Sequence, residues 1–345
     1  MINKKVYFVT GRTSTIDINF LPANVEGLEK IIVLNHPSLT LKTAVLRNII
    51  DYYQPNHSLE IILSSVDDSY VEGVICRKEL LAIITDRLVT PEILTTQVIN
   101  LADFFETYVV SEDQLQAKKY RDRAAGYFSQ GLAVHDDLEK IYIEEMDFTK
   151  ADKMFDDFIQ ILLQNELKRE QPPCVYHRFF GTTTAKGPVN VVPHLIKNLS
   201  RRVYIKGRAG TGKSVFMKKV ATACQNIGLD TELYHCSFDP DSIDMVLVPE
   251  LSFCIFDSTD PHAFSPERTS DMTIDLYEGS VTPGTDEKFA AEIKEVTRSY
   301  KSFLQQGINS LKQAHEYQIK SEEGYKIITE KNVKEVTNTI LKHIM

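Results

Sequence analysis

Short apolar runs along the chain alternate with segments whose apolar residues recur at helical spacing. Residues 32–34, 203–207 and 251–257 are compact apolar runs, which are typical of buried strands in a parallel sheet. Residues 214–228 carry apolar side chains at helical spacing and end at Gly228, as an amphipathic helix does. Because strands and helices alternate, we expect an α/β fold of three-layer α/β/α domains with mainly parallel sheets.

Longer helices are predicted outside these alternating units. They are expected at residues 95–107, 112–140, 150–168, 286–320 and 325–344. Their apolar positions do not keep a sustained heptad, so packing within the chain is favoured over a coiled-coil dimer.

The sequence matches itself at an offset of about 171 residues. The matched pairs include Pro22 with Pro193, Leu28 with Leu199, Lys42 with Lys213, Asp86 with Asp257, and Gln130-Gly131 with Gln306-Gly307. Two unrelated α/β domains of similar composition are the alternative. A length of 345 residues suits two domains. We expect a first domain over residues 1–170 and a second over 175–345, with the boundary within residues 165–177.

The second copy contains a glycine-rich motif between a predicted strand and a predicted helix. Residues 207–214 fit the pattern G-x-x-x-x-G-K-[ST]. Glycines let backbone N–H groups converge on phosphate oxygens, and the helix N-terminus behind them attracts negative charge. The predicted nucleotide-binding residues are Gly207, Arg208, Ala209, Gly210, Thr211, Gly212, Lys213 and Ser214.

Lys213, Ser214 and Asp257 are the predicted reactive groups around ATP and Mg²⁺. Lys213 would reach the β- and γ-phosphates, and the Ser214 hydroxyl would bind Mg²⁺. Asp257 ends an apolar run, as expected of a second Mg²⁺ ligand. An ordinary turn-forming aspartate is the alternative.

The polar loop after the predicted strand 231–236 supplies further candidates. We expect this strand beside the phosphate loop, so Asp239 or Asp241 would orient water or an acceptor hydroxyl. Turn formation is an equally good account of both aspartates. Glu250 is a third candidate for the same role, and His262 is a weaker one. Arg178, Arg208 and Arg268 are candidate partners of the γ-phosphate.

The matching place in the first copy lacks every glycine. His36, Leu39 and Leu41 stand at the glycine positions, and Pro37 removes a donor N–H group. Lys42 is retained, but without the glycines it is only a point charge. We therefore expect this copy to bind no nucleotide. A different phosphate or a non-nucleotide ligand is the open alternative.

Charge and composition limit the class of protein. The formal net charge is −9, and residues 1–170 hold 18 basic and 27 acidic residues, so this part carries all of it. Nucleic acid is therefore not an expected partner, whereas a protein partner could use the acidic first domain. The sequence shows no membrane-length apolar run or signal peptide, and its five cysteines have no CxxC spacing. We expect a cytoplasmic protein with reduced thiols.

The motif at 207–214 together with Asp257 resembles the P-loop NTPase superfamily. The strings FFGTTTAKGPVN (179–190) and HCSFDPDSIDMVLVPELSFCIFDSTDPH (235–262) resemble those of a bacterial family of tandemly duplicated P-loop proteins, described as predicted ATPases or nucleotide-kinase-like proteins. The resemblance implies ATP and Mg²⁺ use and supplies no substrate. Because the first copy here lacks the glycines, a mechanism with two nucleotide sites is in doubt.

The expected function is that of an Mg²⁺-dependent ATPase with its active site in the second domain and a regulatory or partner-binding first domain. A kinase acting on a small molecule or a nucleotide is one alternative, and a nucleotide-binding switch or scaffold with negligible turnover is another.

Overall fold

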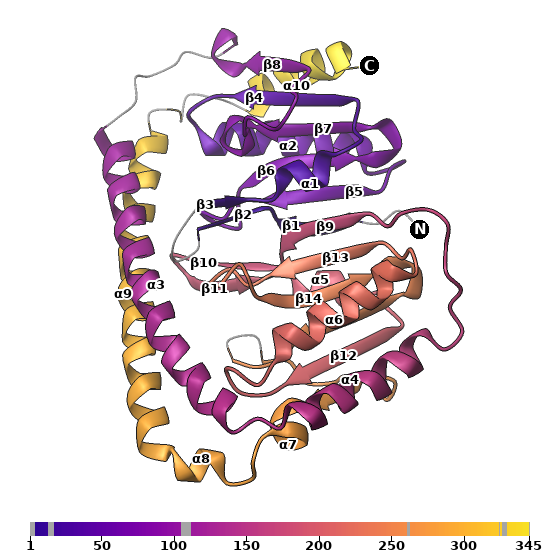
Figure 1. Ribbon diagram of the computed structural model, residues 1–345. Helices are drawn as coiled ribbons and strands as arrows, with labels where there is room; N and C mark the ends of the chain where they lie inside the picture. The colour runs from indigo at the N-terminus through magenta and orange to yellow at the C-terminus, as the bar shows by residue number, and fades with distance from the viewer. Residues whose placement is uncertain are drawn as a thin grey trace.

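The computed structural model describes residues 4–12, 17–104, 112–260, 263–323, 325 and 330–344. The fold is α/β, as the sequence predicts. Among the described residues, 12 strands form a single sheet in the order β16-β12-β15-β14-β13-β9-β1-β5-β6-β7-β4-β8. Strands β9 and β1 are neighbours at a junction in the middle of this sheet, and the remaining strands lie on either side of them (Figure 1).

The first and second halves of the chain contribute equivalent halves of this sheet. The first-half strands are β1 (Lys4–Phe8), β4 (Lys30–Asn35), β5 (Leu59–Leu63), β6 (Val71–Cys76), β7 (Leu81–Thr85) and β8 (Gln97–Asn100). The second-half strands are β9 (Val175–Phe179), β12 (Arg201–Lys206), β13 (Thr231–His235), β14 (Ile243–Val248), β15 (Phe253–Asp257) and β16 (Met272–Asp275). Counted outward from the junction, both halves have the same strand order. Within each half the strands run parallel except β6 and β14.

Small hairpins follow the innermost strand of each half. They are β2 (Thr10–Arg12) with β3 (Asp17–Asn19), and β10 (Gly181–Thr184) with β11 (Gly187–Asn190). The halves meet where Phe8 pairs with Phe179, two residues that are 171 positions apart. Leu80 and Ser252 share the left-handed backbone conformation at equivalent turns. The offset found in the sequence thus relates residues in equivalent positions of the sheet.

Helices and 3₁₀ turns connect the strands and cover both faces. The helices are α1 (Leu21–Val25), α2 (Leu39–Tyr53), α3 (Glu112–Glu144), α4 (Phe148–Leu163), α5 (Val192–Ile196), α6 (Lys213–Asn226), α7 (Leu276–Ser280), α8 (Thr285–Lys288), α9 (Ala290–Glu323) and α10 (Glu330–Ile344). The 3₁₀ turns are η1 (Arg77–Glu79), η2 (Asp86–Leu88), η3 (Leu101–Asp103) and η4 (Pro249–Leu251). The predicted helix at 95–107 is wrong, because residues 97–100 pair with β4 as an edge strand. No helix among the described residues is long and apolar enough to span a membrane.

The long helices α3 and α9 pack against each other and run past the ends of the strands on one side of the sheet (Figure 1). They cross at Gly131 and Gly307, the glycines of the repeated Gln-Gly pairs. A Cβ at Gly307 would lie 2.3 Å from the Phe128 ring, and one at Gly131 would lie 3.4 Å from Phe303. Gly307 therefore permits the close approach of the two helices, whereas a Cβ at Gly131 would make only an ordinary contact. Packing of the two helices within the chain is confirmed.

The helices that follow α3 and α9 are exchanged between the halves. Phe158 and Leu162 of α4, from the first part of the chain, enter the core around α6 of the second half. Val336 and Ile340 of α10, near the end of the chain, enter the core around α2 of the first half. Each half of the sheet is therefore completed by a helix from the other half of the chain.

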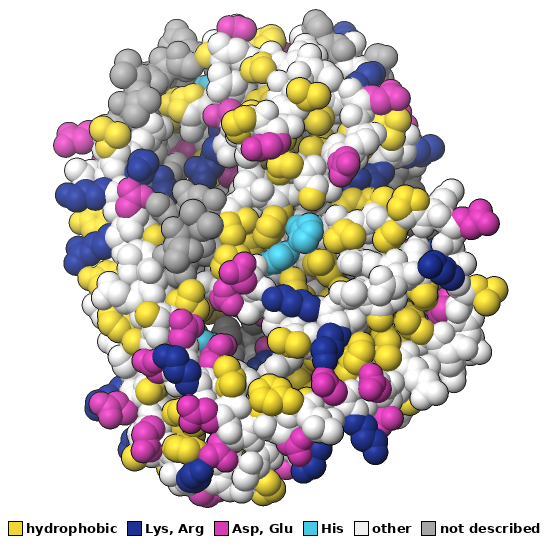
Figure 2. Space-filling model, in the orientation of Figure 1, with side chains coloured by type: hydrophobic (Ala, Val, Ile, Leu, Met, Phe, Trp, Pro, Cys, Tyr) yellow, Lys and Arg dark blue, Asp and Glu magenta, His cyan; other side chains and the backbone are white. Residues whose placement is uncertain are grey.

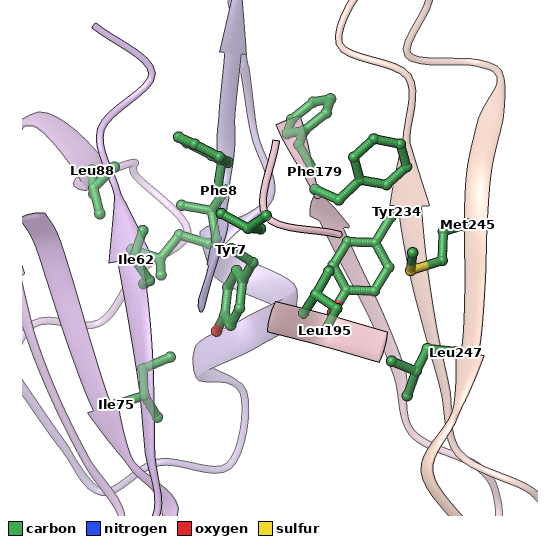
Figure 3. Close-up of a cluster of buried hydrophobic side chains, with 14 of the residues drawn as sticks. Tyr7, Phe8, Ile62, Ile75, Leu88, Phe179, Leu195, Tyr234, Met245 and Leu247 are labelled. Carbon is green, nitrogen blue, oxygen red and sulfur yellow. The ribbon is translucent and has the colours of Figure 1, made fainter. Parts of the chain in front are cut away.

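The junction between the halves has a continuous apolar core and a buried charge network. Tyr7, Phe8 and Ile62 from the first half face Tyr234 and Met245 from the second (Figure 3). This continuity shows that the halves share one interior.

Arg178 is the centre of the buried charge network. It is 1% exposed and bonds to Glu60 at 2.8 Å and to Glu232 at 2.7 Å. Burial opposes ionisation of Glu60, but Arg178 and Arg77 lower the pKa of Glu60 to about 2. Arg178 thus bridges two glutamates at equivalent positions, and Arg77 at Glu60 and Lys5 at Glu232 supply the further positive charge.

Candidate functional site

The loop between β12 and α6 contains the glycine-rich motif. Strand β12 ends at Lys206 and α6 begins at Lys213, so the motif has the expected strand–loop–helix context. Gly210 and Gly212 have φ angles of 74° and 81°, a conformation that glycine adopts far more readily than other residues.

Side chains are excluded from the loop by contacts as well as by conformation. A Cβ at Gly207 would lie 2.3 Å from Oγ1 of Thr211, and one at Gly210 would lie 2.4 Å from the carbonyl oxygen of Glu139 in α3. Thr211 is buried, and its hydroxyl donates to the carbonyl of Arg208 at 2.8 Å. The loop is therefore compact, and α3 lies directly against it.

Lys213 is folded over its own loop. Its ammonium donates to the carbonyl oxygens of Arg208 at 2.8 Å and Gly207 at 3.4 Å, and lies 3.7 Å from Oδ2 of Asp257. These are neutral acceptors and one long ion pair. A phosphate group would be a stronger partner for the lysine, because charge-assisted hydrogen bonds are the stronger ones.

Asp257 and Ser214 lie beside this lysine. Asp257 ends β15, which is the neighbour of β12, and its register partner is Ile205. Its Oδ1 accepts hydrogen bonds from the Thr259 backbone at 2.9 Å and the Thr259 hydroxyl at 2.5 Å. The hydroxyl oxygen of Ser214 accepts from the backbone N–H of Ile243 at 2.9 Å. One oxygen of Asp257 thus forms a turn, and the other is nearest to Lys213.

Asp244 adds a second carboxyl that no motif marks. It follows Ile243 at the start of β14. Burial raises the pKa of Asp244 to about 8, with a further contribution from Asp257, whereas Cys236 and Lys213 oppose the shift. A lone acid in the otherwise apolar run 243–248 is the sequence signal that could have identified it. Near neutral pH such a group can accept or release a proton.

Asp239 and Asp241 lie in the turn between β13 and β14. Asp239 accepts hydrogen bonds from the backbone of Asp241 at 3.3 Å and from the hydroxyl of Ser242 at 2.6 Å. Turn formation therefore accounts for Asp239, while its charge also acts on His135 and Glu139 of α3. The prediction that strand 231–236 lies beside the phosphate loop is wrong, because β13 is not a neighbour of β12, the strand that leads into this loop. The antiparallel strand β14 and then β15 separate β13 from β12.

Helix α3 lies against the glycine-rich loop, and α9 packs beside α3 near the turn between β13 and β14. The His135 ring of α3 lies 5.3 Å from the ring of Tyr300 in α9 and 6.4 Å from that of Phe238. Burial lowers the pKa of His135, so the imidazole is uncharged near neutral pH. Burial, with Asp136 and Asp239 nearby, raises the pKa of Glu139. The surroundings of Lys213 thus include titratable groups of α3.

The arginines predicted as γ-phosphate partners have other roles. Arg178 lies in the junction network, and Arg268 donates to backbone carbonyls of the segment before β12. Arg208 belongs to the loop but forms an ion pair with Asp286 at 2.9 Å and stacks on Tyr277 at 4.6 Å.

Glu250 does not belong to the site. Glu250 forms an ion pair with Arg169 at 2.8 Å, at the end of β15 opposite to Asp257. His262 lies outside the described residues.

The first half fills the equivalent place with its own side chains. Ser38 caps α2, and its hydroxyl donates to Glu322 of α9 at 2.5 Å. The same carboxylate accepts from the backbone N–H groups of Leu39 at 2.8 Å and Thr40 at 3.4 Å. A carboxylate from the end of α9 therefore occupies the N-terminus of α2, where a phosphate would bind in an intact loop.

Lys42 also has a partner within the first half. It is 1% exposed, and its ammonium lies 2.5 Å from Asp86, the counterpart of Asp257. Burial lowers the pKa of Lys42, while Asp86 opposes the shift. The equivalent pair in the second half, Lys213 with Asp257, is longer at 3.7 Å.

On the face shown in Figure 2, Lys and Arg side chains are interspersed with Asp and Glu. Within the described part of the chain, no group of three or more His, Cys, Asp or Glu is arranged to hold a metal. No family model matches the chain, and no curated protein or solved structure matches it either.

Proposed function

We propose that the second half binds Mg·ATP at loop 207–212 and hydrolyses it, and that the first half is a regulatory or partner-binding copy of the same P-loop unit. The observation that carries the proposal is the contrast between the two helix N-termini. Helix α6 has Gly212 at its N-cap position and no side-chain cap, whereas α2 is capped by Ser38 and bonded to Glu322. Uncapped N–H groups at a helix N-terminus form a ready anion site.

The residues at the loop fit a bound triphosphate. The glycines keep the backbone free of Cβ atoms, and Lys213 is within reach of its own loop and of Asp257. Ser214 and Asp257 would hold Mg²⁺, which prefers a few protein oxygens together with phosphates and waters. When bound, Mg²⁺ would offset negative charge on the phosphate oxygens.

Each protein group then has a distinct task. Lys213 orients the phosphates and stabilises their charge. Asp244 in its ionised form accepts a proton from the attacking water, so this step becomes faster as the pH rises toward the pKa of about 8. His135 and Tyr300 belong to the helices that cover the loop and limit the entry of water.

Phosphate release from ATP tests the proposal directly. We expect Mg²⁺-dependent release by the wild type and a loss of about 100-fold or more in Lys213→Ala, since the lysine stabilises charge in the transition state. Lys218→Ala, at an exposed position of the same helix, is the matched control and should keep full activity. Wild-type protein that neither binds nor hydrolyses ATP would refute the proposal, and equal rates in both variants would assign the activity to a contaminant.

A kinase is the second candidate, because Asp239 and Asp244 place acidic groups on the same side of the loop as Lys213. Transfer of labelled phosphate to nucleosides or small metabolites would favour it. The α3–α9 pair, which touches both halves, also suits a switch with negligible turnover. ATP binding by calorimetry without phosphate release would support that function. For partners, we propose that the acidic first half binds another protein.

A further inference from the structure

A cavity of about 520 Å³ lies away from the loop, between the first half of the sheet and the α3–α9 pair. Hairpin β2–β3, the end of β5 and the residues after η2 form one wall. Helices α3 and α9 form another, and the second half adds Thr182, Thr183, Ser237 and Phe238. This volume is typical of sites for small organic ligands.

Basic side chains gather at the cavity although they belong to the acidic part of the chain. The ionised lining residues are Arg87, Lys118, Arg121, Glu72 and Asp122. Arg87 pairs with Glu72 and Lys118 pairs with Asp122, so basic groups exceed acidic groups by one here, whereas residues 1–170 carry the whole net charge of −9. This local reversal of charge favours an anionic ligand.

Arg87 is the best-placed anion donor. Its Nε bonds to buried Glu72 at 2.8 Å, and Glu72 also accepts from the hydroxyl of Ser64 at 3.1 Å. These bonds fix the guanidinium at the cavity wall. The described residues supply no hydrogen-bond partner for its terminal NH₂ groups, which form the planar fork suited to phosphate.

The rest of the lining suits an uncharged body with hydroxyl groups. Apolar contacts come from Ile18, Phe128, Phe238 and Leu311. Hydroxyl groups come from Thr10 and Ser65, which are 3.0 Å apart, and from Thr182 and Thr183. Aromatic and apolar walls with a few polar groups are typical of sites that enclose a planar or apolar ligand.

We propose that this cavity binds a small organic phosphate with a planar or apolar body, of about the size of a nucleoside monophosphate. Arg87 holds the phosphate, and Phe128 and Phe238 contact the body. The site is separate from the glycine-rich loop, and the proposal does not rest on ATP hydrolysis. Phe238 precedes Asp239 in the turn that faces α3, so the turn lies between the two sites.

Calorimetric titration with AMP, GMP, CMP and UMP tests this site. We expect at least one of them to bind at one molecule per chain, and about tenfold or more tighter than inorganic phosphate or the matching nucleoside alone. Arg87→Ala should weaken binding about tenfold or more. Because that change also leaves Glu72 unpaired, Ala125→Phe provides a second test. It fills the cavity from α3 without removing a charge.

Matched controls separate this site from the loop. Ala133→Phe, at an exposed position of the same helix, and Lys213→Ala should both bind the monophosphate as the wild type does. Failure of all four monophosphates to bind would overturn the proposal, as would equal binding by Ala125→Phe or loss of binding in Lys213→Ala. Tighter binding of citrate than of any monophosphate would refute the phosphate assignment. If ATP hydrolysis is absent but the monophosphate binds, only the proposed ATPase function fails.

Discussion

Glu322 provides the sharpest test of how the first half is closed. Its carboxylate bonds to Ser38, Leu39 and Thr40 at the N-terminus of α2, from a helix 284 residues away in the sequence. Replacement by alanine removes this acceptor and leaves two buried donors without a partner. We therefore expect Glu322→Ala to lower the free energy of unfolding and to loosen the docking of α9 on the first half.

The magnitude follows from the burial of each donor. Ser38 and Leu39 are buried, and each buried unsatisfied donor costs about 1–3 kcal/mol. Thr40 is exposed, so water replaces its bond at little cost. Loss of the anion from the helix N-terminus adds about 0.5 kcal/mol. Partial relaxation lowers the sum, so we expect about 2–4 kcal/mol for alanine. Glutamine keeps one acceptor oxygen and should cost about half as much.

Urea unfolding followed by circular dichroism measures this change. Glu316→Ala, at an exposed position of the same helix, controls for effects on α9 itself and should change stability by less than about 0.5 kcal/mol. A double-mutant cycle with Ser38→Ala should show a coupling of about 1 kcal/mol or more, because the two side chains are directly bonded. If the Glu322→Ala protein is as stable as the Glu316→Ala control, the Glu322 carboxylate does not stabilise the N-terminus of α2 and the prediction is wrong.

Three further predictions use other parts of the structure. The pKa of Asp244 is raised from 3.8 to about 8, so the folded state retains a proton that the unfolded state loses, and wild-type stability falls as pH rises across this range. Asp244→Asn should therefore be more stable than the wild type at pH 8 and equal to it below pH 4, and equal melting temperatures at pH 8 would contradict this. Arg178→Met should cost about 3 kcal/mol in urea unfolding, because it removes the buried cation shared by two carboxylates and leaves Glu60 with Arg77 and Glu232 with Lys5. A loss below about 1 kcal/mol would argue against the charge network. Gly307→Ala should destabilise the protein by about 1–3 kcal/mol, because its Cβ would clash where α3 and α9 cross. Gly126→Ala, with no atom near its Cβ, should stabilise the protein by up to about 1 kcal/mol. Effects of the same sign would show that the crossing is not tightly packed.

Local patterns predicted the long helices and some of the strands. The runs at 203–207 and 251–257 are β12 and β15, and the long helix expected at 112–140 is α3. The exception is residues 95–107, where Val98 and Ile99 align with β4 instead of continuing a helix. A short apolar segment fits either structure, and the free edge of a sheet decides between them.

The candidate site was only partly predictable. The spacing of Gly207, Gly212 and Lys213 identified the loop, because backbone conformation depends on the local residues. Asp244 was missed, since its pKa depends on Asp257 and on burial that no local pattern reveals. Arg178 was assigned to the wrong place for the same reason.

The sequence by itself determined the α/β class, the repeat at an offset of about 171 residues and the glycine loop between strand and helix. Each of these depends on residue spacing and on backbone preferences that act over a few positions. Only the tertiary structure decided that α4 and α10 are exchanged between the halves. It also decided that the Glu322 carboxylate binds the N-terminus of α2 and that a charged cavity lies beside α3 and α9. These features depend on which surfaces pack together across hundreds of residues, and local composition does not encode that pairing.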